Sequence, residues 1–272
     1  ARLRRAFLSG AELEDHELLE LLLTYAIPRA DVNPLAHHLL DRFGGLEKVF
    51  QTSPEELKEL AGVGESAAVL IKTVQALQKR LLVRYYTAGS RRRVLFSLEE
   101  ACAFALALSL EDHYETLHLI CLDSKGQVLR TKTLAVGGVN YVSVEPRHVA
   151  QEALLCNARY VLLCHNHPSG DVRPSDADLQ VGVQMKKSLE GIGIQLLDQL
   201  VAGQGAVYSQ SRDKVLCFHG EAPCETLLPE EFARRYGFER SEREYDGFQH
   251  QAAEDCFPAD DPFSWGGSSD LY

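Results

Sequence analysis

The sequence predicts a small all-helical domain followed by an α/β domain, and three observations indicate this fold class. Up to about residue 85, apolar residues recur at helical spacing in segments separated by short breaks. From Val94 onward, strand-like and helix-like segments alternate, as they do in α/β domains. Between the two patterns, the stretch YYTAGSRRR combines glycine, serine and clustered arginines, a composition typical of exposed linkers. We therefore expect a helical domain over residues 1–88, a linker over 89–96 and an α/β domain over 97–218.

The helical domain contains four apolar segments of helical period. They are ELLELLLTYAI, PLAHHLLDRF, SPEELKEL and AVLIKTVQALQKRLL. The third has the clearest start, because Ser53 can serve as the N-cap, Pro54 suits the first helical position and Glu56 completes a capping box. These features predict a small domain built from helices alone.

The turn LAGVG, which contains Gly62 and Gly64, joins the last two of these helices. Paired glycines allow a tight turn whose amides face outward at a helix N-terminus, where they can contact a DNA backbone phosphate. A plain turn between helices is the simpler explanation of a lone GxG. The carboxylate of Glu65 at the phosphate position, with no cation before Lys72, weakens the interpretation as a DNA site.

The α/β domain begins with a capping box at Ser97, which opens a helix to about Leu108. The strands LHLICLD and QVLRTKTLAV follow, separated by a hairpin-like turn at Ser124-Lys125-Gly126. The remaining expected elements are a helix from Pro146 to near Asn157, a buried strand YVLLCH, a long helix from Ser175 to Leu189, and the strands IQLLDQLVA and AVYSQ.

Composition indicates a soluble cytoplasmic protein. No run of roughly eighteen apolar residues occurs, and the apolar stretch near the start is too short for a signal peptide, so we expect no membrane span and no secretion. The seven cysteines are odd in number and form no CxxC pair, so we expect no disulfide framework. The chain opens on Ala1 and its single methionine is Met185, so we expect the native start to lie upstream.

Most of the net charge of −11 belongs to residues 219–272, which are rich in acidic residues, glycine, serine and proline. This segment has no sustained period, so we expect a largely disordered, acidic tail with a helical stretch around PEEFARRYG. The N-terminal part is nearly neutral. Overall charge therefore argues neither for nor strongly against nucleic-acid binding.

The segment CHNHPSGDVRPSDAD, residues 164–178, carries the clearest chemistry. It follows a buried strand, in which residues two apart point to the same side, so His165 and His167 can present two imidazoles to one ion. Asp178 lies three residues after the helix start at Ser175, where its side chain can lean back toward the histidines. Zinc accepts all three ligands, and a fourth position stays free for water, as in catalytic sites. The sequence therefore predicts one zinc ion per chain, which would lower the pKa of its water toward about 7.

Each part of this segment also has an ordinary explanation. Ser175 followed by Asp178 is a helix-capping signature by itself, and a lone His-x-His is usually surface or core histidine. The combination of a histidine pair, a chain-breaking proline, a glycine-containing loop and an acidic helix start within fourteen residues favours a metal site. Cys164 should point away from His165, so we assign it to the core.

The spacing His165-x-His167-Pro168, followed by Ser175 and Asp178, resembles the JAMM motif of the MPN/JAB metallopeptidases. More closely, HNHPSGDVRPSDAD, preceded by VEPRHVAQEALLCNA and by a helical domain with a glycine hairpin, resembles the bacterial RadC family. The resemblance implies a JAB/MPN-like, cytidine deaminase-like mixed sheet flanked by helices, after a small helix-hairpin-helix domain. It also implies zinc-dependent hydrolysis of an amide or isopeptide bond in a peptide or protein, in a family labelled as DNA repair.

The same resemblance assigns two catalytic residues. JAMM enzymes use a glutamate upstream of the motif, at the edge of a strand, as general acid/base, and Glu115 in HYETLHLICLDSKG stands at the matching place. It would take a proton from the attacking water and return it to the leaving amine. Ser175 would help to hold the developing oxyanion, a role compatible with capping its helix.

Two other functions stay open from the sequence. A DNA-associated adaptor would contact the DNA backbone through Gly62 and Gly64 and use the second domain as a binding module, and a steep salt dependence of DNA affinity would favour it. The complete ligand set argues against this alternative, because a binding module does not need metal ligands. A zinc deaminase would also activate water, but its H-x-E and P-C-x-x-C signatures are absent from the sequence.

Overall fold

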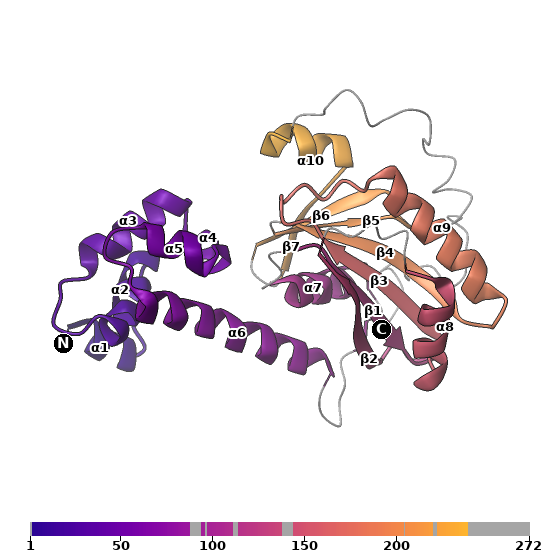
Figure 1. The fold of residues 1–272 in the computed structure, drawn as a ribbon, viewed down its shortest axis with the longest axis horizontal. Coiled ribbons are helices and arrows are strands. Elements are labelled where there is room, and N and C mark those ends of the chain that lie inside the picture. The colour runs from indigo at the N-terminus through magenta and orange to yellow at the C-terminus, as the bar shows by residue number, and fades with distance from the viewer. Residues whose placement is uncertain are drawn as a thin grey trace, which may run out of the picture. The chain divides into compact units, whose positions relative to one another are not determined.

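The computed structural model describes residues 2–87, 94–95, 97–110, 114–137, 144–203, 205–219 and 222–238 (Figure 1). The chain divides into two compact units, residues 1–81 and 82–272. This division falls a few residues before the end of the helical domain expected from the sequence. Most of the expected linker, 89–96, lies outside the described residues, as does the tail from residue 239 onward.

The first unit is helical, as the sequence predicts. Its helices are α1 (Arg2–Leu8), α2 (Asp15–Ala26), α3 (Asn33–Phe43), α4 (Leu46–Gln51), α5 (Pro54–Glu59) and most of α6 (Glu65–Thr87). The hydroxyl of Ser53 accepts a hydrogen bond from the amide of Glu56, which confirms the predicted capping box of α5. A single cluster of buried apolar side chains, which includes Leu19, Leu39 and Ile71, forms the core.

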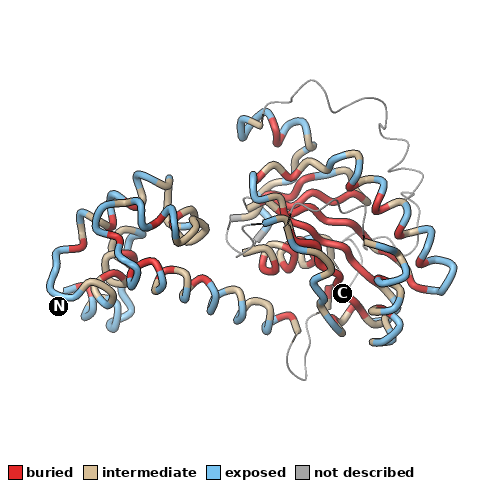
Figure 2. Tube along the Cα trace, viewed as in Figure 1, coloured by how far each residue is buried: buried red, intermediate tan, exposed pale blue. Residues whose placement is uncertain are grey.

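The second unit is built on a mixed seven-stranded sheet, which confirms the predicted α/β class. In spatial order its strands are β2 (Val128–Val136), β1 (Thr116–Leu122), β3 (Tyr160–Asn166), β4 (Gln195–Gly203), β5 (Ala206–Ser209), β6 (Lys214–His219) and β7 (Ala222–Leu227). Among these strands only β3 and β4 pair in parallel. Figure 2 shows that the central strands are mostly buried, because helices cover both faces of the sheet.

Alternate residues of the central strands contact helices on opposite faces. Ile120 and Cys164 pack in one apolar cluster with Phe104, whereas Leu119 and Leu163 pack in another. The first cluster includes the helix α7 (Leu98–Ser109), and the second includes α8 (Pro146–Leu155) and α9 (Asp176–Glu190). The prediction that Cys164 belongs to the core is confirmed, and no described helix is both long and apolar enough to cross a membrane.

Two elements extend the second unit beyond residue 218. The helical stretch expected around PEEFARRYG is present as α10 (Pro229–Tyr236), and β7 pairs with β6 at the edge of the sheet. The strand β7 was not predicted, because the sequence APCETL alternates weakly and contains Pro223. An edge strand tolerates proline, since one side of its backbone has no strand to pair with.

Candidate metal centre

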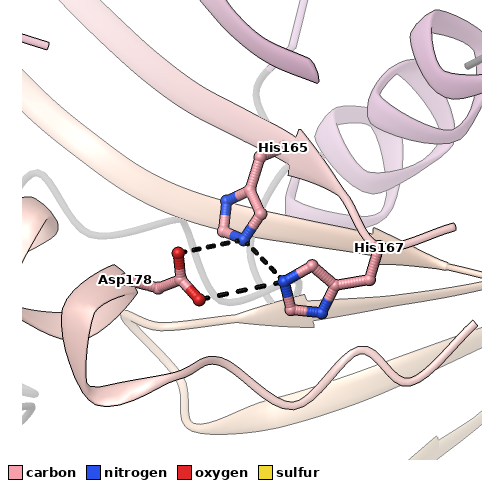
Figure 3. Close-up of side chains that lie close together, drawn as sticks. All are labelled: His165, His167 and Asp178. Atoms are coloured by element: carbon pink, nitrogen blue, oxygen red, sulfur yellow. Dashed lines mark hydrogen bonds and ion pairs between the residues drawn. The ribbon is translucent and has the colours of Figure 1, made fainter. Parts of the chain in front are cut away.

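The three predicted metal ligands lie together, two at the end of β3 and one at the start of α9 (Figure 3). The Nε2 atoms of His165 and His167 are 3.1 Å apart. The Asp178 Oδ1 atom lies 3.4 Å from Nε2 of His165, and its Oδ2 atom lies 3.8 Å from Nε2 of His167. The side chains therefore converge on one point, as the sequence predicted. That they hold a metal stays a prediction.

The distances between the donor atoms fit a zinc ion. With zinc–ligand bonds of about 2.1 Å, the corners of a tetrahedron lie about 3.4 Å apart. The three separations of 3.1, 3.4 and 3.8 Å lie around this value. Three donors leave one corner for a water or substrate oxygen, which is the arrangement of catalytic rather than structural zinc sites.

The position of the histidines follows from the pairing of β3. His165 is 1% exposed and sits within the strand, hydrogen-bonded in the sheet between β1 and β4. The amide of His167, one residue past the strand, still donates to the carbonyl of Ala202 at 2.8 Å. The extended backbone therefore continues through both residues, and their side chains share one face of the sheet.

A hydrogen bond on the other side of its ring fixes the tautomer of His167. The Nδ1 atom lies 2.6 Å from the carbonyl oxygen of Asp171. Because a carbonyl oxygen only accepts, Nδ1 carries the proton and Nε2 keeps its lone pair. An outer hydrogen bond of this kind is usual for a metal-binding histidine, because it orients the ring and raises its basicity.

Asp178 is held by the capping box of α9. The Ser175 hydroxyl donates to Asp178 Oδ2 at 2.6 Å and the Ser175 amide donates to the same oxygen at 2.8 Å, while the Asp178 amide donates back to Ser175 Oγ. The side-chain amide of Gln199 donates to the Asp178 carbonyl at 2.7 Å. Ser175 therefore caps the helix and orients a ligand, and its role toward an oxyanion stays a prediction.

The electrostatics at Asp178 and His167 favour the protonation states in which these two side chains bind zinc. Burial alone would raise the pKa of Asp178, but its hydrogen bond and charge interaction with His165 and its bonds from Ser175 hold this pKa well below the usual range. Burial and the neighbouring His165 lower the pKa of His167, although the Asp171 carbonyl and nearby carboxylates oppose this. A carboxylate and a neutral imidazole are thus the forms present near neutral pH, as metal binding requires.

These pKa shifts predict that the metal-free protein loses stability in acid. The pKa of His167 is lower in the folded chain than its ordinary value of 6.5, so the unfolded chain binds more protons as pH falls through 6.5. The pKa of Asp178 is also lower in the folded chain than its ordinary value of 3.8, so the folded chain loses further stability as pH falls below 3.8. Urea unfolding of the chelator-treated chain between pH 8 and about pH 2 measures both losses. His167→Gln should remove the first of them, and a stability that rises on acidification would contradict the prediction.

Glu115 lies next to the ligands by strand register. Leu117 on β1 pairs with His165 on antiparallel β3, and this is the last pair of the ladder at that end. Continued for two residues along both chains, the same register brings Glu115 opposite His167 and on the same face. Its carboxylate is near enough to raise the pKa of His167. The structure thus places the predicted acid/base at the edge of the site, half-buried and outside the group of three ligands.

Asn166 holds the backbone around Glu115, a contact that no sequence pattern indicated. Its side-chain oxygen accepts from the amide of Thr116 at 2.8 Å, and its side-chain nitrogen donates to the carbonyl of Tyr114 at 3.1 Å. Both bonds join residues about fifty positions apart, one on either side of Glu115. Asn166, between the two histidines, therefore ties the backbone around the predicted acid/base to the strand that carries the histidines.

The predicted DNA-contact residues, Gly62 and Gly64, belong to the other unit. Gly62 has φ +99°, and a Cβ atom there would lie 3.3 Å from Leu35 Cδ1, so turn geometry and packing account for it. The carbonyl of Gly64 accepts from the first turn of α6. The ammonium of Lys72, the nearest following cation, donates to the carbonyls of Phe50 and Thr52. These contacts favour a structural turn, and DNA contact stays a prediction.

Gly182 of α9 allows two glutamines to hold the start of that helix. Gln199 and Gln210 donate through their side-chain amides to the carbonyls of Asp178 and Leu179. The side-chain oxygens of both glutamines face Gly182. A Cβ atom at Gly182 would overlap with both oxygens and would lie 2.9 Å from the Gln199 oxygen. The absence of a side chain at this position therefore supports the placement of a ligand.

We expect Gly182→Ala to weaken zinc binding by about tenfold, because displaced outer hydrogen bonds typically cost a metal site this much or more. Overpacking should also lower the free energy of unfolding by about 1–3 kcal/mol. Chelator competition and urea unfolding measure the two effects. Gly191→Ala is the matched control, since Gly191 has helical φ and its nearest neighbour would be 4.0 Å away. Unchanged zinc affinity in Gly182→Ala would contradict the prediction.

Comparison with known proteins agrees with this architecture. A family model described as RadC-like JAB domain matches residues 96–215, and one described as UPF0758 N-terminal matches residues 5–69. A UPF0758 protein of Rhodobacter capsulatus is 39% identical over 75% of this chain and 94% of its own length. A UPF0758 protein of Ruegeria pomeroyi is 36% identical over 76% of this chain and 92% of its own length. One of Pseudomonas fluorescens is 33% identical over 74% of this chain and 89% of its own length. The chain therefore belongs to the UPF0758 family of RadC-like proteins.

Proposed function

We propose that this chain is a zinc-dependent hydrolase of the JAMM metallopeptidase type, which cleaves an amide or isopeptide bond in a peptide or protein. The observation that carries the proposal is the convergence of His165, His167 and Asp178 at distances suited to zinc, with Glu115 opposite His167. The match to a RadC-like JAB domain supports the same proposal.

The residues of the site would divide the chemistry among them. His165, His167 and Asp178 would hold zinc, which when bound supplies Lewis acidity that makes hydroxide available near neutral pH. Glu115 would take a proton from the attacking water and return it to the leaving amine. Ser175 would donate to the oxyanion. Its hydroxyl donates to Asp178 in this structure, so that role requires it to turn toward the substrate.

Metal analysis and peptide hydrolysis test the proposal together. We expect about one zinc per purified chain after zinc loading, and little in His165→Ala. Incubation with a mixture of linear and isopeptide-linked peptides, read by mass spectrometry, should yield new termini. Chelation should abolish these products, and added zinc should restore them. A folded wild-type chain that retains no zinc would overturn the proposal.

A DNA-associated adaptor, the alternative kept from the sequence, has less support in this structure. Gly62 is accounted for by its own turn, Lys72 caps the end of α4, and Glu65 adds a negative charge at the start of α6. A steep fall of DNA affinity with rising salt, lost in Gly64→Glu, would restore this alternative.

A further inference from the structure

The loop between the histidine pair and Asp178, residues 168–175, contacts the predicted metal ligand His167 through its backbone. The carbonyl of Asp171 accepts from His167 Nδ1 at 2.6 Å. The direction of this carbonyl therefore sets the orientation of the imidazole, and with it the direction of the Nε2 lone pair. Whatever holds Asp171 in place also positions the ligand.

Asp171 is held by Arg173. The Arg173 Nε atom lies 3.0 Å from each carboxylate oxygen, and Nη2 lies 2.6 Å from Oδ2. The backbone amide of Arg173 also donates to the carboxylate at 3.1 Å. Both side chains are largely shielded, at 17% and 24% exposed, so solvent screens this forked pair less than a pair on the open surface.

Arg173 also reaches the end of the described chain. Its Nη2 atom donates to the carbonyl of Phe238, just after α10, at 3.2 Å. This bond joins residues 65 positions apart and ties the loop to the segment Ala222–Phe238, which contains β7 and α10. Figure 1 shows α10 beside the segment that leads into α9.

Packing reinforces the same connection. Val172, between Asp171 and Arg173, is fully buried in an apolar cluster that includes Phe232 of α10 and the partly buried Phe238. Below the loop, Gly203 at the end of β4 would place a Cβ atom only 2.7 Å from the Gly170 carbonyl and from Val172. The loop is therefore confined between the end of β4 and the C-terminal segment.

The C-terminal segment lies outside the shared family domain. The match to the RadC-like JAB domain ends at residue 215, within β6, and β7 and α10 follow it. The metal-site loop thus rests on an element that lies beyond the residues matched by the family model. A segment that only lengthened the sheet would not need a hydrogen bond to the arginine of that loop.

We infer that the segment Ala222–Phe238 is a clamp for the metal centre, and that Arg173 is its positioning residue. Through Arg173 and Val172 the segment fixes Asp171, and Asp171 fixes the ring of His167. This inference rests on the metal centre proposed above, but it does not depend on the bond that the protein cleaves.

Titration of the full-length chain with Zn²⁺ and Co²⁺ tests the clamp, at a temperature where circular dichroism shows every variant folded. Arg173→Gln should weaken Zn²⁺ binding by about 10- to 100-fold. It should also change the visible spectrum of the Co²⁺-loaded chain, which reports ligand geometry. Arg173→Lys keeps the charge without the forked geometry, so its Zn²⁺ affinity should lie between those of Arg173→Gln and wild type.

Arg235→Gln is the matched control, because Arg235 pairs with Glu225 within the C-terminal segment and, in the part of the chain that the structure describes, makes no hydrogen bond or ion pair to the loop. It should leave both metal readouts unchanged. Wild-type Zn²⁺ affinity and an unchanged Co²⁺ spectrum in Arg173→Gln would overturn the clamp and leave the metal centre standing. An equal loss in Arg235→Gln would also overturn it, since the effect would then be one of general stability. A wild-type chain that binds neither metal would overturn the metal centre and the clamp with it.

Discussion

Asp178→Asn is expected to abolish zinc retention in an otherwise folded chain. The substitution keeps the volume of the side chain but removes the negative charge and the anionic oxygen donor. Asp178 is only 3% exposed, so water cannot readily replace this donor. The two imidazoles alone would then face the cation without charge compensation. We expect the zinc affinity to fall by more than the roughly 100-fold upper limit for loss of an outer hydrogen bond. Competition with a chromogenic chelator measures the affinity, and circular dichroism checks the fold.

Asp176→Asn separates loss of the ligand from loss of charge at the helix start. Asp176 and Asp178 both lie in the first turn of α9, so either change removes one negative charge from the same helix N-terminus. Asp176 is not in the group of three converging ligands, and its substitution should leave zinc binding at the wild-type level. Equal zinc affinity in Asp178→Asn and wild type would show that Asp178 is not a ligand.

The part of the site that the sequence could predict is the part encoded locally. His165 and His167 share a face because a strand has a period of two, and Asp178 returns toward them because Ser175 starts a helix three residues earlier. All three ligands lie within fourteen residues, so two local rules suffice to bring them together. No long-range contact had to be known.

The contacts that support the ligands could not be predicted in this way. Asn166 reaches a residue 50 positions away, Gln199 one 21 positions away and Arg173 one 65 positions away. Each contact depends on strand register or on packing between elements, which residue spacing does not encode. Glu115 is intermediate: only the family resemblance singled it out, and the β1–β3 register then placed it opposite His167. A register shift of one residue would have turned it to the other face.

Glu115→Gln should keep zinc and lose turnover. Glu115 is outside the group of metal-ligand atoms, so the neutral amide should leave zinc content and affinity near the wild-type values. Glutamine keeps the size of the side chain but cannot accept and return a proton, and loss of a general acid/base typically lowers the rate by about 10²- to 10⁴-fold. Product formation from the peptide mixture, compared at equal zinc content, measures the effect.

Three outcomes of this experiment have different meanings for the mechanism. Wild-type turnover in zinc-loaded Glu115→Gln would remove Glu115 from proton transfer. Joint loss of zinc and turnover would instead give Glu115 a role in holding the metal, against its position outside the three ligands. Lost turnover with intact zinc would support the proposed role, provided that Glu190→Gln, at the far end of α9, stays active. The register that places Glu115 opposite His167 favours this last result, because a carboxylate there lies beside the ligands without replacing any of them.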